Sequence, residues 1–155
     1  MKFQDKRGWL KIEFESDNIV FKESFSKKNV LRGLHYQTSP NEQVKIINVK
    51  SGSILDFQYD VQDQDSDITY MKIDSTMGWF LVPKKFAHGF YALEDTIFQY
   101  ICIGKYSLDF ERSYNISGTL YRDKKIDNTN ISIKDVNGIM LKNKIIFNDS
   151  QLIKI

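Results

Sequence analysis

The sequence predicts an all-β protein, folded as an antiparallel sandwich or barrel. Helical periodicity of apolar residues is nearly absent from the 155 residues. Short stretches rich in Ile, Val, Phe and Tyr stand in its place, separated by polar or Gly-containing turns. A chain of this length can build one hydrophobic core and is too short for two ordinary domains. We therefore expect a single domain over residues 1–155.

The predicted strands follow from the turn signals that bound them. Ser39-Pro40-Asn41, Ser51-Gly52 and Met77-Gly78 each interrupt the apolar pattern, as do the acidic stretches at 63–67 and 94–95. Between these breaks the pattern predicts strands at Leu10–Phe14, Asn18–Ser24, Val30–Tyr36, Val44–Lys50, Gly52–Val61, Thr69–Ile73, Trp79–Val82, Gly89–Ala92, Thr96–Ile103 and Lys144–Phe147. The polar stretch Ser107–Lys134 predicts mostly loop and turns, lying against the barrel.

Alternate side chains of a barrel strand enter the interior. In Thr96–Ile103 this period places Phe98, Tyr100 and Cys102 on one face. In Gly52–Val61 it places Asp56 with Ile54, Gln58 and Asp60 on one face, opposite an apolar face of Leu55, Phe57, Tyr59 and Val61. Such a strand either exposes its polar face at an edge or lines a polar cavity while its apolar face packs on another layer. The pattern leaves both arrangements open.

Composition excludes several classes of function. The formal charge is +2, from 22 basic and 20 acidic residues, and no run of like charge reaches five. We therefore expect no nucleic-acid partner and no membrane-binding segment. The single cysteine, Cys102, cannot form a disulfide within the chain. With no apolar stretch after Met1 and no span of about eighteen apolar residues, this predicts a cytoplasmic protein.

Two histidines are the first candidates for acid–base chemistry. His35 lies in the block VLRGLHYQ at 30–37, and His88 lies in VPKKFAHGF at 82–90. Histidine changes charge nearest to neutral pH, which suits a general base. The alternative is that each is a hydrogen-bonded structural residue. Two basic residues, Arg32 and Lys45, lie near His35 in sequence, and their presence favours the functional interpretation.

The stretch from Gly78 through Pro83 to His88 resembles the second characteristic motif of cupins, in which a Pro-containing turn leads to an inward-facing His. Metal-binding cupins carry a His-x-His pair in their first motif, where this chain has only His35. With two histidines in all, a bound iron, manganese or zinc ion is not expected. The resemblance implies an antiparallel jelly-roll (cupin-like) β-barrel without a metal.

More specifically, the chain resembles the dTDP-4-dehydrorhamnose 3,5-epimerases and related nucleotide-sugar epimerases from Asp5 to about Asp135. The specific pair of blocks is LRGLH at 31–35 followed by AHGF at 87–90. The further matching blocks are Asp5-Lys6-Arg7-Gly8-Trp9, Gln43-Val44-Lys45, Ser51 to Asp56, Val82-Pro83, and Tyr100 through Tyr106.

The resemblance implies roles for individual residues. Inverting a carbon beside a ketone needs a base, an acid for the opposite face, and a partner for the enolate oxygen. The family's base corresponds to His35, oriented by Asp135 in the block ISIKD at 131–135. Its acid corresponds to Tyr100, and its enolate-stabilising cation to Lys45. The substrate-binding positions correspond to Arg7, Arg32, Gln37, His88 and Tyr106, of which the two arginines would hold phosphates.

The resemblance therefore implies a homodimeric isomerase that acts on a nucleoside-diphosphate 4-keto sugar, a 6-deoxy sugar or a heptose, made for a surface polysaccharide. No cofactor is expected, because the 4-keto group already acidifies the C3 and C5 protons. Three alternatives stay open: an epimerase for C3 or C5 only, a keto-isomerase of the same fold, and a non-catalytic sugar-binding cupin. The nucleotide is also left open.

Overall fold

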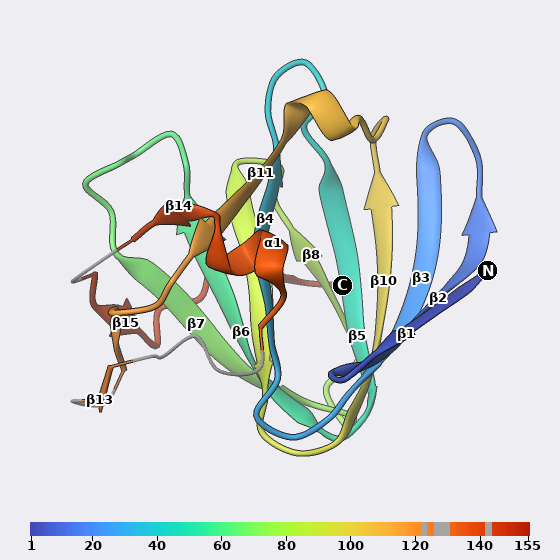
Figure 1. The fold of residues 1–155 in the computed structure, drawn as a ribbon, viewed down its shortest axis with the longest axis horizontal. Coiled ribbons are helices and arrows are strands. Elements are labelled where there is room, and N and C mark those ends of the chain that lie inside the picture. The colour runs from blue at the N-terminus through green and yellow to red at the C-terminus, as the bar shows by residue number, and fades with distance from the viewer. Residues whose placement is uncertain (122–123, 126–130, 142–143) are drawn as a thin grey trace.

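Two curled seven-stranded sheets face each other in the computed structural model (Figure 1), which describes residues 1–121, 124–125, 131–141 and 144–155. The first sheet has the order β1-β2-β3-β10-β5-β8-β16 and the second the order β14-β11-β4-β9-β6-β7-β15. The strands of the first are β1 (Lys2–Asp5), β2 (Gly8–Glu15), β3 (Ile19–Ser26), β10 (Thr96–Ile103), β5 (Val44–Ser51), β8 (Trp79–Val82) and β16 (Ile153–Lys154).

The second sheet comprises β14 (Ile139–Met140), β11 (Glu111–Asn115), β4 (Leu31–Gln37), β9 (Phe86–Ala92), β6 (Ser53–Asp60), β7 (Ile68–Asp74) and β15 (Ile146–Phe147). A third pairing joins β12 (Leu120–Tyr121) to β13 (Lys124–Lys125), and the helices are η1 (Leu108–Phe110) and α1 (Ile133–Val136). Neighbouring strands are antiparallel except at two short edge pairings, β11 with β14 and β15 with β7. The predicted all-β jelly-roll is confirmed. No helix among the described residues is long and apolar enough to cross a membrane.

Apolar side chains form two separate cores. One fills part of the space between the sheets: Ile47, Val49, Ile54, Ile73, Phe80, Val82, Phe86, Phe90 and Phe98. The other lies on the outer face of the second sheet, where the C-terminal segment covers it: Leu31, Leu34, Leu55, Phe57, Tyr59, Ile68, Ala87, Ile116, Ile131, Leu141 and Ile146. Figure 1 shows the helix α1 lying against β4 and β11 of this sheet.

Strand β6 therefore has both faces buried. Its polar row, with Asp56 and Gln58, lies inside the barrel, while Phe57 and its neighbours pack in the outer core. Of the two arrangements that the alternation left open, the structure has the second. The covering layer is the chain's own C-terminal segment.

The expectation of loop and turns over Ser107–Lys134 is wrong in part. Glu111–Asn115 forms β11, which pairs antiparallel with β4. Its sequence, ERSYN, is polar and shows no apolar alternation, so the sequence alone does not predict a strand here. The segment is extended because its backbone pairs with the edge of β4. Within the same stretch, residues 122–123 and 126–130 lie outside the described part of the chain.

Candidate active site

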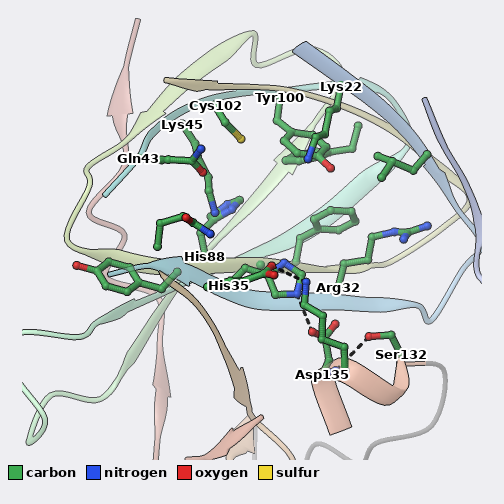
Figure 2. A pocket seen from close by; sticks show the side chains of 18 of the residues that line it. Lys22, Arg32, His35, Gln43, Lys45, His88, Tyr100, Cys102, Ser132 and Asp135 are labelled. Carbon is green, nitrogen blue, oxygen red and sulfur yellow. Dashed lines mark hydrogen bonds and ion pairs between the residues drawn. The ribbon is translucent and has the colours of Figure 1, made fainter. Parts of the chain in front are cut away.

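A cavity of about 460 Å³ opens between the two sheets (Figure 2). Strand β4 forms one wall, while β3, β5 and β10 form the facing wall. The structure brings together every residue that the sequence singled out for the site; these nine line this cavity: Arg7, Arg32, His35, Gln37, Lys45, His88, Tyr100, Tyr106 and Asp135.

A register shift in β4 brings Arg32 and His35 to the same cavity. Residues three apart in a regular strand point to opposite faces. Between these two residues the pairing of β4 with β9 shifts, so that His35 lies opposite His88. Gly33 permits this, with a φ of +94° and no room for a Cβ, which would lie 2.7 Å from the carbonyl oxygen of His88. The glycine of the LRGLH block is thus needed for packing.

His35 and Asp135 form a hydrogen-bonded pair on the cavity wall. Nε2 of His35 lies 2.6 Å from Oδ1 of Asp135, whose Oδ2 accepts from the backbone N–H of Gly33 at 3.2 Å. Asp135 is buried, with only 1% of its surface exposed. Burial raises its pKa, but the hydrogen bonds from His35 and Gly33 outweigh this and hold the pKa below its usual value.

The pKa of His35 is lowered from its ordinary 6.5. Burial in the cavity is the main cause, and Asp135 opposes it only in part. His35 is therefore mainly neutral at pH 7. An ionised Asp135 can only accept, so Nε2 carries the proton and the lone pair stays on Nδ1. A neutral imidazole fixed in this tautomer is suited to take up a proton.

Tyr100 and Lys45 point into the cavity from the sheet that faces His35 (Figure 2). Burial raises the pKa of Tyr100 well above 10, so its phenol is protonated and able to donate. Burial also lowers the pKa of Lys45, and no carboxylate of the described residues lies within ion-pair distance of its ammonium group. A cation without a counter-ion is available to a developing negative charge on a bound molecule.

One end of the cavity is strongly basic. Arg32 donates from Nε to Oγ of Ser26 at 2.7 Å, and Arg7 and Lys22 line the same cavity. Burial lowers the pKa of Arg32, and the positive charge of Arg7 adds to the effect. Arg7 is itself held by Asp5, with Nη2 2.6 Å from Oδ2. Like charges that line one cavity favour an anionic ligand.

His88 has a carboxylate partner of its own. Its Nε2 lies 2.7 Å from Oδ2 of Asp56, which also accepts from Nε2 of Gln58 at 2.6 Å through Oδ1. All three side chains are buried. Gln37 accepts at Oε1 from the backbone N–H of Ser107 at 2.9 Å, which joins β4 to the segment after β10.

Other cavity residues were not identified from the sequence. The structure adds Lys22, Gln43, Cys102, Glu111, Ser132 and Lys134 to the lining. Cys102 shares the predicted row with Tyr100, so the alternation already contained its position. Lys22 lies directly opposite Tyr100 on the neighbouring strand, so its side chain points to the same face. An analysis of alternation in Ile19–Ser26 would have placed Lys22 inward. Glu111 and Lys134 fall in the stretch interpreted as loop.

The described residues contain no cluster of three or more His, Cys, Asp or Glu side chains that could hold a metal ion. Both histidines are instead hydrogen-bonded to single carboxylates, Asp135 and Asp56. Metal independence stays a prediction, which chelation tests.

Comparison with known proteins identifies the family. The family model described as dTDP-4-dehydrorhamnose 3,5-epimerase matches residues 1–143. The enzyme of that name from Shigella flexneri is 34% identical over 83% of this chain and 72% of its own, and that from Methanothermobacter thermautotrophicus is 36% identical over 66% of this chain and 55% of its own.

A solved structure of the Sulfolobus tokodaii enzyme of the same name has a TM-score of 0.65 and 36% identity, covering 90% of this chain and 85% of that one. The dTDP-6-deoxy-D-glucose-3,5-epimerase of Legionella pneumophila, solved in complex with dTDP-4-keto-L-rhamnose, has a TM-score of 0.64 and 28% identity, covering 90% of this chain and 84% of that one. This chain belongs to the dTDP-4-dehydrorhamnose 3,5-epimerase family.

Proposed function

We propose that this protein is an isomerase that inverts C3, C5 or both in a nucleoside-diphosphate 4-keto sugar. The observation that carries the proposal is the hydrogen-bonded pair of His35 and Asp135, which shares one cavity with Tyr100 and with Lys45, whose ammonium group pairs with no carboxylate of the described residues. A binding site without turnover has no need for a base and an acid matched in this way.

The reaction follows from these groups. Nδ1 of His35 takes the proton from the carbon beside the ketone, and the electron pair of the broken C–H bond moves into the ring to leave an enolate at C4. The ammonium of Lys45 stabilises the enolate oxygen. The phenol of Tyr100 then returns a proton from the opposite face, which inverts the carbon. Exchange with water restores neutral His35 and protonated Tyr100.

The basic end of the cavity supports a diphosphate-linked substrate. Arg7, Lys22 and Arg32 would face the phosphates, because guanidinium and ammonium groups are the usual partners of phosphate oxygens. The Legionella relative was solved with a dTDP-linked 4-keto sugar, which fits this charge distribution. We propose the same substrate class for this chain, with roles in substrate binding for Gln37, His88 and Tyr106 and a place in surface-polysaccharide synthesis.

Incubation with a dTDP-4-keto-6-deoxy sugar in deuterated water tests the function directly. Deuterium at both C3 and C5 with inversion is the expected result. Deuterium at one carbon alone would indicate a mono-epimerase, and a moved ketone would indicate an isomerase of the same fold. Binding of the nucleotide sugar without any exchange would identify a non-catalytic sugar-binding protein.

We further propose that the protein is a homodimer and cytoplasmic. The hairpin of β1 and β2 lies at the edge of the first sheet, where Phe3 and Phe14 are 50% and 57% exposed. Such exposed phenylalanines are typical of a surface that binds a second subunit. Light scattering on the purified protein, with Phe14→Ser as the variant, tests the dimer. Cys102 is a buried free thiol, as is common in reducing compartments.

A further inference from the structure

Asp135 is held on a very short element. It lies on the four-residue helix α1, on the outer side of β4, whereas His35 lies on β4 itself. A helix of one turn does not hold its own conformation in water, so contacts with the barrel must fix it. One of these contacts is a hydrogen bond from a side chain to the backbone of the helix: Nδ2 of Asn115 on β11 donates to the carbonyl oxygen of Val136 at 2.8 Å.

A second contact comes from the residue before Asp135. Nζ of Lys134 lies 2.5 Å from Oε1 of Glu111 on β11, and the phenol of Tyr106 donates to Oε2 of the same carboxylate at 2.8 Å. The side chain of Glu111 is only 12% exposed, whereas that of Lys134 is 50% exposed. Glu111 therefore joins three segments at the cavity rim: the stretch after β10, the strand β11 and the helix α1.

Adjacent residues of a helix point about 100° apart. Fixing the direction of Lys134 therefore also fixes the direction of Asp135. We propose that the ion pair between Glu111 and Lys134 positions Asp135 against His35 and so orients the general base. The inference rests on the proposed epimerase function, in which His35 is that base. Glu111 and Lys134 are positioning residues here and do not act on the reacting carbons.

The Glu111 carboxylate of this pair stays ionised at working pH. Burial raises the pKa of Glu111, but the hydrogen bonds from Lys134 and Tyr106 outweigh it and leave the pKa below its usual value. Since Lys134 is half exposed, the pair should contribute little to the free energy of unfolding. Its effect is expected in the geometry of the base and hardly at all in stability.

Proton NMR of the uniformly ¹⁵N-labelled protein can test the geometry without substrate. The chain has two histidines, and Nε2 of each lies within hydrogen-bond distance of a carboxylate, Asp135 for His35 and Asp56 for His88. Each should give a downfield imidazole N–H signal. Glu111→Gln and Lys134→Gln should broaden or remove the His35 signal and leave that of His88, which is held by barrel strands alone. Lys134→Arg keeps the charge and should keep both signals.

A matched control is the ion pair of Lys85 and Asp60, with an N–O distance of 3.2 Å and exposures of 44% and 21%. It lies away from the main cavity. Asp60→Asn should change neither signal. With the 4-keto nucleotide sugar, Glu111→Gln and Lys134→Gln should lower kcat for deuterium exchange by about tenfold to a hundredfold at similar KM, because a displaced base loses its alignment.

The two proposals fail in different ways. No exchange by the wild-type protein would contradict the function and leave the NMR test standing. Unchanged His35 signals and wild-type kcat in Glu111→Gln and Lys134→Gln would overturn the positioning role. The positioning role would also be overturned if Glu111→Gln and Lys134→Gln lost both histidine signals and showed a fall in Tm that Asp60→Asn does not show. The ion pair of Glu111 and Lys134 would then support the fold in general.

Discussion

Oδ1 of Asp135 lies 2.6 Å from Nε2 of His35, although the two residues are 100 positions apart in the chain. The contact forms because β11 pairs with β4 and carries α1 over the outer face of the second sheet. The carboxylate fixes the tautomer of the imidazole, so that Nδ1 keeps its lone pair. Most of the testable chemistry of this site follows from this one contact.

Replacing His35 should abolish proton abstraction. In His35→Asn the side-chain amide has no basic nitrogen, so solvent deuterium should no longer enter C3 or C5. Binding of dTDP, measured by calorimetry, should stay near the wild-type value, because the basic end of the cavity is untouched. A variant that still exchanges deuterium at the wild-type rate would show that another group is the base.

The sequence predicted the barrel and its main strands because both depend on local alternation. The row of Tyr100 and Cys102 follows from the two-residue period alone. The common position of Arg32 and His35 does not follow from this period. Residues three apart point to opposite faces of a regular strand, and the shifted register at Gly33 brings these two side chains to the same cavity. The resemblance to a family predicted that both residues belong to the site, whereas periodicity alone would have placed them on opposite faces.

The missed parts are those that depend on contacts between distant segments. The alternation in Gly52–Val61 places Asp56 on a polar face, but nothing in that strand predicts its hydrogen bond to His88. Glu111 and Lys134 lie in a polar stretch whose conformation depends on the edge of β4. Hydrogen bonding to a neighbouring strand leaves no apolar period in the sequence, so pattern analysis interprets such a segment as loop.

The pH dependence of exchange should show the lowered pKa of His35. The base must be unprotonated, so kcat/KM for exchange should fall on the acid side, with its midpoint below pH 6.5. Asp135→Asn removes the group that raises the pKa of His35, so this variant should be slower, with its midpoint moved to still lower pH. A midpoint above 6.5 in the wild type would contradict the assignment.

The same shift makes stability depend on pH. In the unfolded chain His35 titrates near its ordinary 6.5, whereas in the folded protein it does so at lower pH. Below pH 6.5 the unfolded state therefore binds more protons, and the free energy of unfolding should decrease as the pH falls. Urea titrations between pH 5 and 7.5 should show a smaller decrease in His35→Asn than in the wild type.

Removal of metal ions should leave the activity unchanged. The chemistry needs a cation at the enolate oxygen, and Lys45 supplies one from the protein itself. Full exchange activity after dialysis against a strong chelator is the expected result. Loss of activity that a single divalent metal restores would contradict it, while Lys45→Gln should be impaired with or without added metal.

Tyr100 should be required for inversion more than for proton abstraction. Its phenol is protonated at neutral pH, because burial raises its pKa, and it lines the cavity from the sheet opposite His35. Tyr100→Phe keeps the ring and its packing but removes the acidic proton. Deuterium should still enter with retained configuration through His35, while inversion should fall by roughly two to four orders of magnitude, the usual contribution of a positioned acid.

Tyr114→Phe is the matched control for this measurement. Tyr114 is a partly buried tyrosine that packs against the outer core, where it contacts Tyr59, and it does not line the cavity. Its loss of a hydroxyl should affect neither exchange nor inversion. If Tyr100→Phe lost exchange and inversion equally, Tyr100 would have a binding or structural role. Undiminished inversion would remove it from the mechanism, and a different donor would then have to reach the face of the sugar opposite His35.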